Sequence, residues 1–179
     1  MWFIIFLDID GVLNSEKYIL KMHKKYGENK KAIPEEIYNL RFLNEKAFKL
    51  LGEVVKQTNA KIILSSSWRS AFVNNYPAQD NLLAQQFYAI LQKYGMTISG
   101  ITTLKHKDRG LQILEYVSQY LLETDCWIVI DDECSDIIQY IPDNKFIKTD
   151  FKTGFMKNHM RKAIKLLNQQ LKVKLHDNR

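Results

Sequence analysis

The stretch FLDIDGVLN (residues 6–14) decides the fold of this chain, because in it an apolar run ends in two carboxylates. The residues up to this point are mostly aromatic and branched, which predicts a β-strand over residues 2–8. Asp8 and Asp10 stand at its end, with Gly11 directly behind them. Sites in open α/β sheets lie at the carboxyl ends of the strands, so this strand marks one edge as the place of a functional site.

Composition places the chain among ordinary globular proteins. It has 179 residues, of which 46% are hydrophobic and 26% charged, enough for one domain over residues 1–179 with a sizeable core. The apolar start has no basic leader and meets Asp8 and Asp10 before it could serve as a signal core. We therefore expect a cytoplasmic protein without stable membrane association.

Helical and strand patterns alternate along the rest of the chain. Residues 14–43 are a mixed, lysine-rich insertion, too short for a domain of its own, that would form a flap or small helical cap. The patterns after it predict helices over residues 44–57, 80–91, 108–121 and 155–171, and strands over residues 60–65, 96–101, 126–130 and 145–149. Asn44, Asp80 and Asp108 are the expected N-caps of the first three helices. This order predicts an α/β fold with a central parallel sheet covered on both faces.

Acids and a hydroxyl follow three of the predicted strands. Besides Asp8 and Asp10, Ser65 ends the second strand, and Asp131 and Asp132 follow the strand CWIVI. Carboxylates gathered at one edge repel each other unless a cation lies among them, and an all-oxygen site suits Mg²⁺. Taken singly, these acids are also compatible with a turn at Gly11 and with a helix-capping cluster; their convergence favours a metal-dependent site.

Other chemistry-bearing residues give weaker signals. Cys126 and Cys134 match neither a zinc pattern nor a disulfide framework, so we expect buried or idle thiols. The four histidines show no metal-binding pair. From Lys145 onward the chain carries ten Lys and Arg residues against Asp150 and Asp177, a bias that suits nucleic acid or an anionic membrane surface. A solvated helix face is the alternative.

The motifs together resemble those of the haloacid dehalogenase (HAD) superfamily. DIDGV resembles the first motif, the serine that ends IILS the second, Arg109 in DRGLQI the third, and DDECSD the fourth. With the late TDFKTGF, the set is most similar to the HAD domain of Swiss Army Knife RNA repair proteins. The resemblance implies a three-layer Rossmannoid fold with a minimal cap, and a Mg²⁺-dependent phosphatase that is a phosphoric monoester hydrolase.

The resemblance also implies roles for the motif residues. Asp8 would be the nucleophile, and Asp10 would carry protons, which requires that its pKa lie above that of Asp8. Ser65 would bind a phosphoryl oxygen, with Ser66 or Ser67 as alternatives. Arg109 would neutralise charge on the transferring group. Because the family usually offers Lys at this position, Lys105 and Lys107 are the alternatives to Arg109.

A ligand set for Mg²⁺ follows from the same resemblance. Asp8, the backbone carbonyl of Asp10, and Asp132 would hold the ion. Asp131 is the alternative to Asp132, because adjacent residues at a strand end point in opposite directions. Asp136 would act on the ion indirectly, through residues that bind it.

The substrate is less well defined by the sequence. A small cap suits a phosphate at the end of a large molecule, and the resemblance points to RNA 3′ ends. Trp68 and Arg69 would then stack a terminal base and contact a neighbouring phosphate, or else be a buried tryptophan with an arginine over it. A phosphatase of small molecules or nucleotides, and an inactive module that binds phosphorylated ligands, are the alternative functions.

Overall fold

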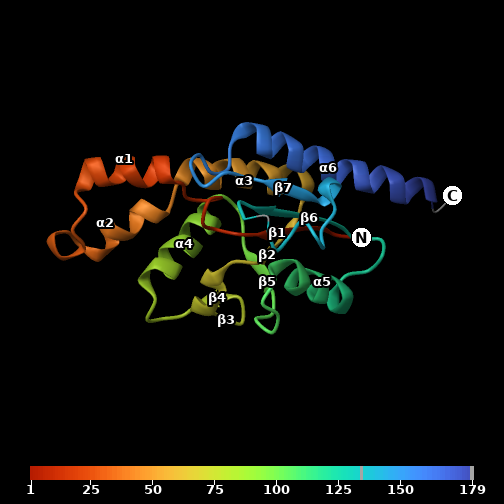
Figure 1. Cartoon of the computed structure of the whole chain (residues 1–179), viewed down its shortest axis with the longest axis horizontal. Helices are drawn as coiled ribbons and strands as arrows, with labels where there is room; N and C mark the ends of the chain where they lie inside the picture. The colour runs from red at the N-terminus through yellow and green to blue at the C-terminus, as the bar shows by residue number, and fades with distance from the viewer. Residues whose placement is uncertain (134, 178–179) are drawn as a thin grey trace.

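Five parallel strands form the centre of the protein. The computed structural model describes residues 1–133 and 135–177, and Cys134 therefore lies outside the described residues (Figure 1). The strand order in the sheet is β5-β2-β1-β6-β7. The strands are β1 (Phe3–Leu7), β2 (Lys61–Leu64), β5 (Ile98–Ile101), β6 (Cys126–Asp131) and β7 (Phe146–Lys148). The predicted α/β fold with a central parallel sheet is confirmed.

The strand β1 lies in the middle of the sheet, which explains its unbroken apolar sequence. Ile5 and Leu7 point into one layer of the core, and Ile4 and Phe6 point into the other. All four side chains are buried. A strand covered on both faces needs an apolar residue at every position rather than at every second one.

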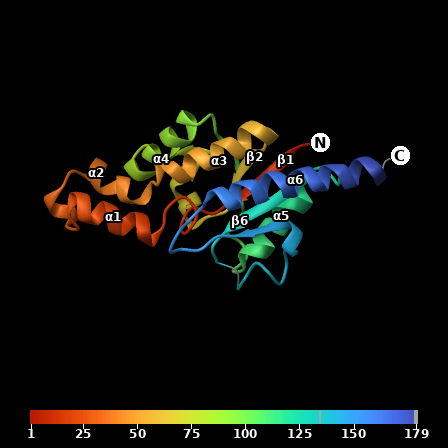
Figure 2. The same cartoon turned by 90° about the horizontal axis from the view of Figure 1, so that it is seen from above.

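Helices cover both faces of this sheet, giving three layers. The helices α3 (Glu45–Thr58), α4 (Leu82–Lys93) and α6 (Lys157–Asp177) contribute to the core on the Ile5 side, and α5 (Arg109–Tyr120) packs on the Phe6 side. Figure 2 shows α3 and α6 side by side over one face and α5 beneath the other. The helix α6 buries Ala163 and Leu167 against the sheet, so its apolar stripe is a packing face. No described helix combines the length and the apolar character needed to cross a membrane.

The insertion over residues 14–43 is helical. It consists of α1 (Glu16–Tyr26), the 3₁₀ turn η1 (Lys30–Ala32), α2 (Glu35–Asn39) and the 3₁₀ turn η2 (Leu40–Phe42). The Tyr18 hydroxyl lies 3.1 Å from the Leu40 carbonyl oxygen and 3.0 Å from that of Leu43, which ties the outgoing limb to the returning one. The segment projects from one end of the molecule (Figure 1).

Some local details differ from the sequence-based expectations. The N-cap of α4 is Asn81 rather than Asp80, because the Asn81 side chain accepts the Ala84 N–H at 2.9 Å. Asn44 precedes α3 as expected but makes no side-chain cap bond. A short hairpin, β3 (Phe72–Val73) and β4 (Tyr76–Pro77), follows β2 and was not expected. The last helix begins at Lys157 and runs to Asp177, beyond the predicted end at residue 171.

Candidate active site

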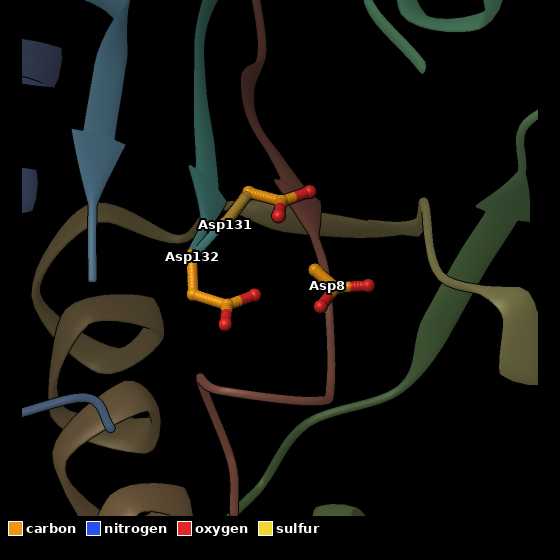
Figure 3. Close-up of side chains that lie close together, drawn as sticks. All are labelled: Asp8, Asp131 and Asp132. Atoms are coloured by element: carbon orange, nitrogen blue, oxygen red, sulfur yellow. The ribbon is translucent and has the colours of Figure 1, made fainter. Parts of the chain in front are cut away.

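Three carboxyl groups meet at the carboxyl ends of β1 and β6. The ladder between these strands pairs Leu7 with Ile130, and it continues as the Asp8 N–H donates to the Ile130 carbonyl at 3.0 Å. Asp8 and Asp131 thereby come opposite one another, and Asp132 follows. One ligand atom from each of the three lies within 4.8 Å of the others, and Figure 3 shows them grouped just beyond the strand ends. Asp8 and Asp131 are buried, and Asp132 is partly buried.

Arg109 is the cation that the fold brings to this cluster. Its Nη1 donates to Asp8 Oδ1, to Asp131 Oδ2 at 2.9 Å and to the Ser65 carbonyl at 2.8 Å. Within the described chain, Nε and Nη2 have no hydrogen-bond partner, so these groups still have hydrogens for a ligand oxygen. Lys105 and Lys107 are exposed, and the Lys105 Nζ lies 3.8 Å from Glu115 instead.

Asp136 holds the start of α5 behind Arg109. Its Oδ2 accepts the Arg109 backbone N–H at 2.9 Å, and its carbonyl accepts that of Gly110 at 3.1 Å. The expected cap, Asp108, makes no cap bond, because its carboxylate accepts the Tyr140 hydroxyl at 2.9 Å. Asp108 is therefore the N-cap residue of α5, as predicted, but the side-chain bond to the first turn comes from Asp136. Asp136 is not part of the close carboxylate cluster and acts on it through Arg109.

The carboxyl groups carry more negative charge than Arg109 balances. Burial raises the pKa of Asp8 to about 6, against the lowering effects of Arg109 and of a Ser66 hydrogen bond. Burial and the neighbouring Asp8 raise the pKa of Asp131 to about 8, and burial also raises that of Asp132. A divalent cation with a preference for oxygen would relieve this repulsion, so the residues present fit Mg²⁺.

Asp131 and Asp132 are not equivalent as ligands. Asp131 Oδ2 already accepts from Arg109, and its Oδ1 accepts the Glu133 N–H at 3.0 Å. Asp132 lies beyond the end of β6, where the strand alternation no longer holds, and both neighbours reach the cluster. Both side chains thus come within reach of one ion, although adjacent residues at a strand end were expected to point in opposite directions.

Gly11 leaves the space that Asp132 occupies. A Cβ atom at this position would lie 2.1 Å from Asp132 Oδ2, well inside the contact distance of the two atoms. The φ of Gly11 is +66°, which L-residues rarely adopt. The Gly11 carbonyl accepts the Thr149 hydroxyl at 2.8 Å, which joins the loop to the end of β7.

Asp10 is held by two neutral donors. Its Oδ1 accepts the Asn14 side-chain amide at 2.7 Å, and its Oδ2 accepts the Trp68 indole N–H at 3.0 Å. The other end of the Asn14 side chain accepts the Gly11 N–H at 2.9 Å. Sequence analysis did not single out Asn14, although an Asn in a loop that closes on its own backbone is a known signal.

The loop after β2 supplies hydroxyl groups. Ser65 Oγ is buried and has no hydrogen-bond partner among the described residues, so it is available to a ligand. The Ser66 hydroxyl forms a hydrogen bond with Asp8 that lowers the pKa of the carboxyl group, and its Oγ also accepts the Trp68 backbone N–H. Ser67 is exposed.

Arg69 faces the interior. Its Nη1 donates to the Ser66 carbonyl at 2.8 Å and its Nη2 to Gln112 Oε1 at 2.7 Å. The residue is only 5% exposed. Arg69 therefore connects the serine loop to α5, and its guanidinium lies in the interior rather than at the surface, where it could contact a phosphate. The sequence had left both placements open.

The strand order and the acidic site are those of a HAD-type domain. A family model described as the HAD domain in Swiss Army Knife RNA repair proteins matches residues 4–160, and the chain belongs to this family. Membership indicates a hydrolase of the phosphatase type, in a class that typically uses Mg²⁺. Comparisons with curated proteins and with solved structures gave no match.

Proposed function

We propose that this protein is a Mg²⁺-dependent phosphatase that works through an aspartyl-phosphate on Asp8 and acts on the phosphorylated ends of large substrates such as RNA. The observation that carries the proposal is the contact of Asp8 with Arg109, beside Asp131 and Asp132 and at the end of the central strand. Asp10 stands two residues on in a separate hydrogen-bonded position, as an acid–base partner requires.

In the first half-reaction, a carboxylate oxygen of Asp8 attacks phosphorus and the bond to the leaving oxygen breaks. Asp10 delivers its proton to that leaving oxygen. The free N–H groups of Arg109 and the unpaired hydroxyl of Ser65 bind the equatorial phosphoryl oxygens, where charge develops.

In the second half-reaction, water attacks the phosphorus of the aspartyl-phosphate. Asp10 takes a proton from this water, the bond between phosphorus and the Asp8 oxygen breaks, and inorganic phosphate leaves. The carboxylate of Asp8 is restored, and Asp10 ends in the protonated state in which it began.

Mg²⁺ held by Asp8, the carbonyl of Asp10 and Asp132 would supply positive charge to the substrate phosphate and to the acidic cluster. The residues have separate duties around it. Asp131 keeps Arg109 in place, and Asp136 fixes the backbone from which Arg109 extends. Gly11 keeps open the space into which Asp132 reaches.

The small cap supports a large substrate. The insertion over residues 14–43 contains two short α-helices, which is little material to enclose a metabolite and exclude water from it. A phosphate at the end of a polymer needs an accessible site rather than a closed chamber. The family description, an RNA repair domain, favours RNA ends among such polymers.

The decisive assay is phosphate release from a 3′-phosphorylated RNA oligonucleotide and from the matching 3′-mononucleotide, with Mg²⁺ and with EDTA. We expect metal-dependent release with a strong preference for the oligonucleotide. Equal or faster cleavage of the mononucleotide would instead indicate a general nucleotidase. No release from either would indicate an inactive phospho-ligand module.

A further inference from the structure

A basic site lies outside the acidic catalytic cluster. A cavity of about 620 Å³ is bounded by α1, the start of α3 and the start of α6. Four lysines line it, together with apolar groups that include Phe155 and Met156. No Asp or Glu is among its described lining residues. The lysines are Lys17, Lys21, Lys46 and Lys157.

These lysines have no acidic partner in the part of the chain that the structure describes. All four are exposed, and none takes part in an ion pair with a described residue. Lysines on ordinary helix surfaces are interspersed with acids, whereas here cations from three separate elements surround one concavity. Their mutual repulsion is relieved when an anionic ligand enters.

The cavity lies at the same edge of the sheet as the catalytic carboxylates. The helix α3 ends just before β2 begins, so it runs back along the sheet and its first residues lie at the carboxyl ends of the strands. The helix α6 follows β7 and starts at that edge too. Figure 1 shows α1, α3 and the start of α6 together at this end of the molecule.

The catalytic loop forms part of the wall of the cavity. Ser15 lines it, and the preceding residue, Asn14, binds Asp10. On the other side, the Phe155 N–H donates to the Val12 carbonyl at 2.8 Å. The wall of the cavity is therefore joined, through a few hydrogen-bonded residues, to the loop that carries the proposed nucleophile.

We propose that this cavity is a groove that binds the single-stranded polynucleotide chain whose terminal phosphate reaches Asp8. The inference rests on the proposed function for the identity of the chain, while the groove itself is argued from its lysines. A nucleic-acid strand carries a negative charge at every nucleotide, which matches four cations without an acid, and its bases have apolar faces for Met156 and Leu50. A phosphopeptide brings one or two charged groups only, and a membrane surface does not fit into a concavity.

The experiment measures binding rather than turnover. A fluorescein-labelled, single-stranded RNA octamer with a 3′-hydroxyl group is titrated with the full chain in EDTA, and anisotropy is followed at several salt concentrations. In the groove variant, four lysines are replaced: Lys17→Gln, Lys21→Gln, Lys46→Gln and Lys157→Gln. The control variant removes the same charge from exposed lysines that do not line the groove: Lys49→Gln, Lys56→Gln, Lys165→Gln and Lys172→Gln.

The groove variant should bind at least about tenfold more weakly at 0.1 M salt. Its plot of log affinity against log salt should be shallower by about 3, because each phosphate contact on a single strand contributes about 0.7. The control variant should stay within about threefold of the unmodified chain. Unchanged binding by the groove variant, or an equal loss in the control, would overturn the proposal.

Two further arms keep the result decisive. RNA that contains 4-thiouridine is crosslinked to the unmodified chain, and crosslinks in residues 15–21, 44–50 and 153–158 are expected; crosslinks confined to other segments would refute the groove. A phosphoserine peptide that binds as tightly, with the same lysine dependence, would refute the nucleic-acid occupant.

Turnover of p-nitrophenyl phosphate with Mg²⁺ is measured separately, so that a failure of the proposed catalysis is distinguished from a failure of the groove.

Discussion

Replacing Trp68 by Phe tests how the acid–base residue is oriented. The Trp68 indole N–H donates to Asp10 Oδ2 at 3.0 Å, while its ring packs against Phe87 with centroids 5.8 Å apart. Phenylalanine keeps an aromatic ring at this position and removes the donor. The change therefore releases one oxygen of Asp10 and leaves the other on Asn14.

The size of the effect follows from the bond that is lost. A hydrogen bond to a charged group contributes about 1.5–3 kcal/mol. Because Asn14 still holds Asp10, we take the lower part of this range, which corresponds to about a tenfold loss in rate. The loss should appear only where proton delivery matters, that is, with alkyl or nucleoside leaving groups.

The assay compares kcat for a 3′-phosphorylated oligonucleotide with kcat for p-nitrophenyl phosphate, whose leaving group needs no proton. We expect about tenfold slowing of the first and less than about twofold slowing of the second. Trp127→Phe is the matched control, because Trp127 lies in the core layer on the other face of the sheet and has no contact with Asp10. It should show no dependence on the leaving group.

Two outcomes would refute the reasoning. Equal slowing of both substrates by Trp68→Phe would mean that the indole does not act through Asp10. A rise in KM for the oligonucleotide with kcat unchanged would mean that Trp68 binds the substrate by stacking, as the alternative from the sequence holds.

Three other perturbations test the rest of the site. Asp8→Asn should abolish turnover of p-nitrophenyl phosphate with an unchanged circular dichroism spectrum, and retained activity would exclude Asp8 as the nucleophile. Gly11→Ala places a Cβ against Asp132 at a φ of +66°. Calorimetry should therefore show weaker Mg²⁺ binding and a loss of about 1–2 kcal/mol in the free energy of unfolding. Unchanged Mg²⁺ affinity would contradict this placement of Asp132. In EDTA, the melting temperature should fall as pH rises from about 4 to 8. Burial raises the pKa of Asp8 from 3.8 to about 6 and that of Asp131 from 3.8 to about 8. In this pH range the folded chain therefore keeps protons that the unfolded chain has already lost. Mg²⁺ should restore stability at pH 8, and a flat EDTA profile would contradict the burial argument.

The sheet could be predicted from the sequence because its signals are local. The strand β1 is apolar on both faces and ends in Asp8, and that pattern fits a central parallel strand better than any helix. The order of strands and helices then limited the fold to a few topologies. The cap of α4 was misplaced by one residue, because Asp80 and Asn81 are both good capping residues and only the geometry of the first turn distinguishes them.

The site was harder to predict where it depends on the directions of side chains. The convergence of acids on one edge could be predicted. That Asp136, rather than Asp108, accepts the backbone N–H of Arg109 could not, because the two aspartates lie 28 residues apart, with a complete strand between them. Nor did the sequence show that Arg69 would turn inward to Gln112, because an arginine beside a motif serine has the same pattern whether it faces solvent or the core.

The two aspartates of the opening stretch differ in their surroundings, and this difference accounts for their pairing. Asp8 lies among charges: it shares Arg109 with Asp131 and has Asp132 beside it. Asp10, two residues later, accepts its hydrogen bonds from the neutral donors Asn14 and Trp68. A nucleophile needs its charge compensated by a cation, whereas a proton carrier must be able to change its charge without disturbing that cation. Placing them two residues apart, directly before a glycine that turns the chain, lets one short loop meet both requirements.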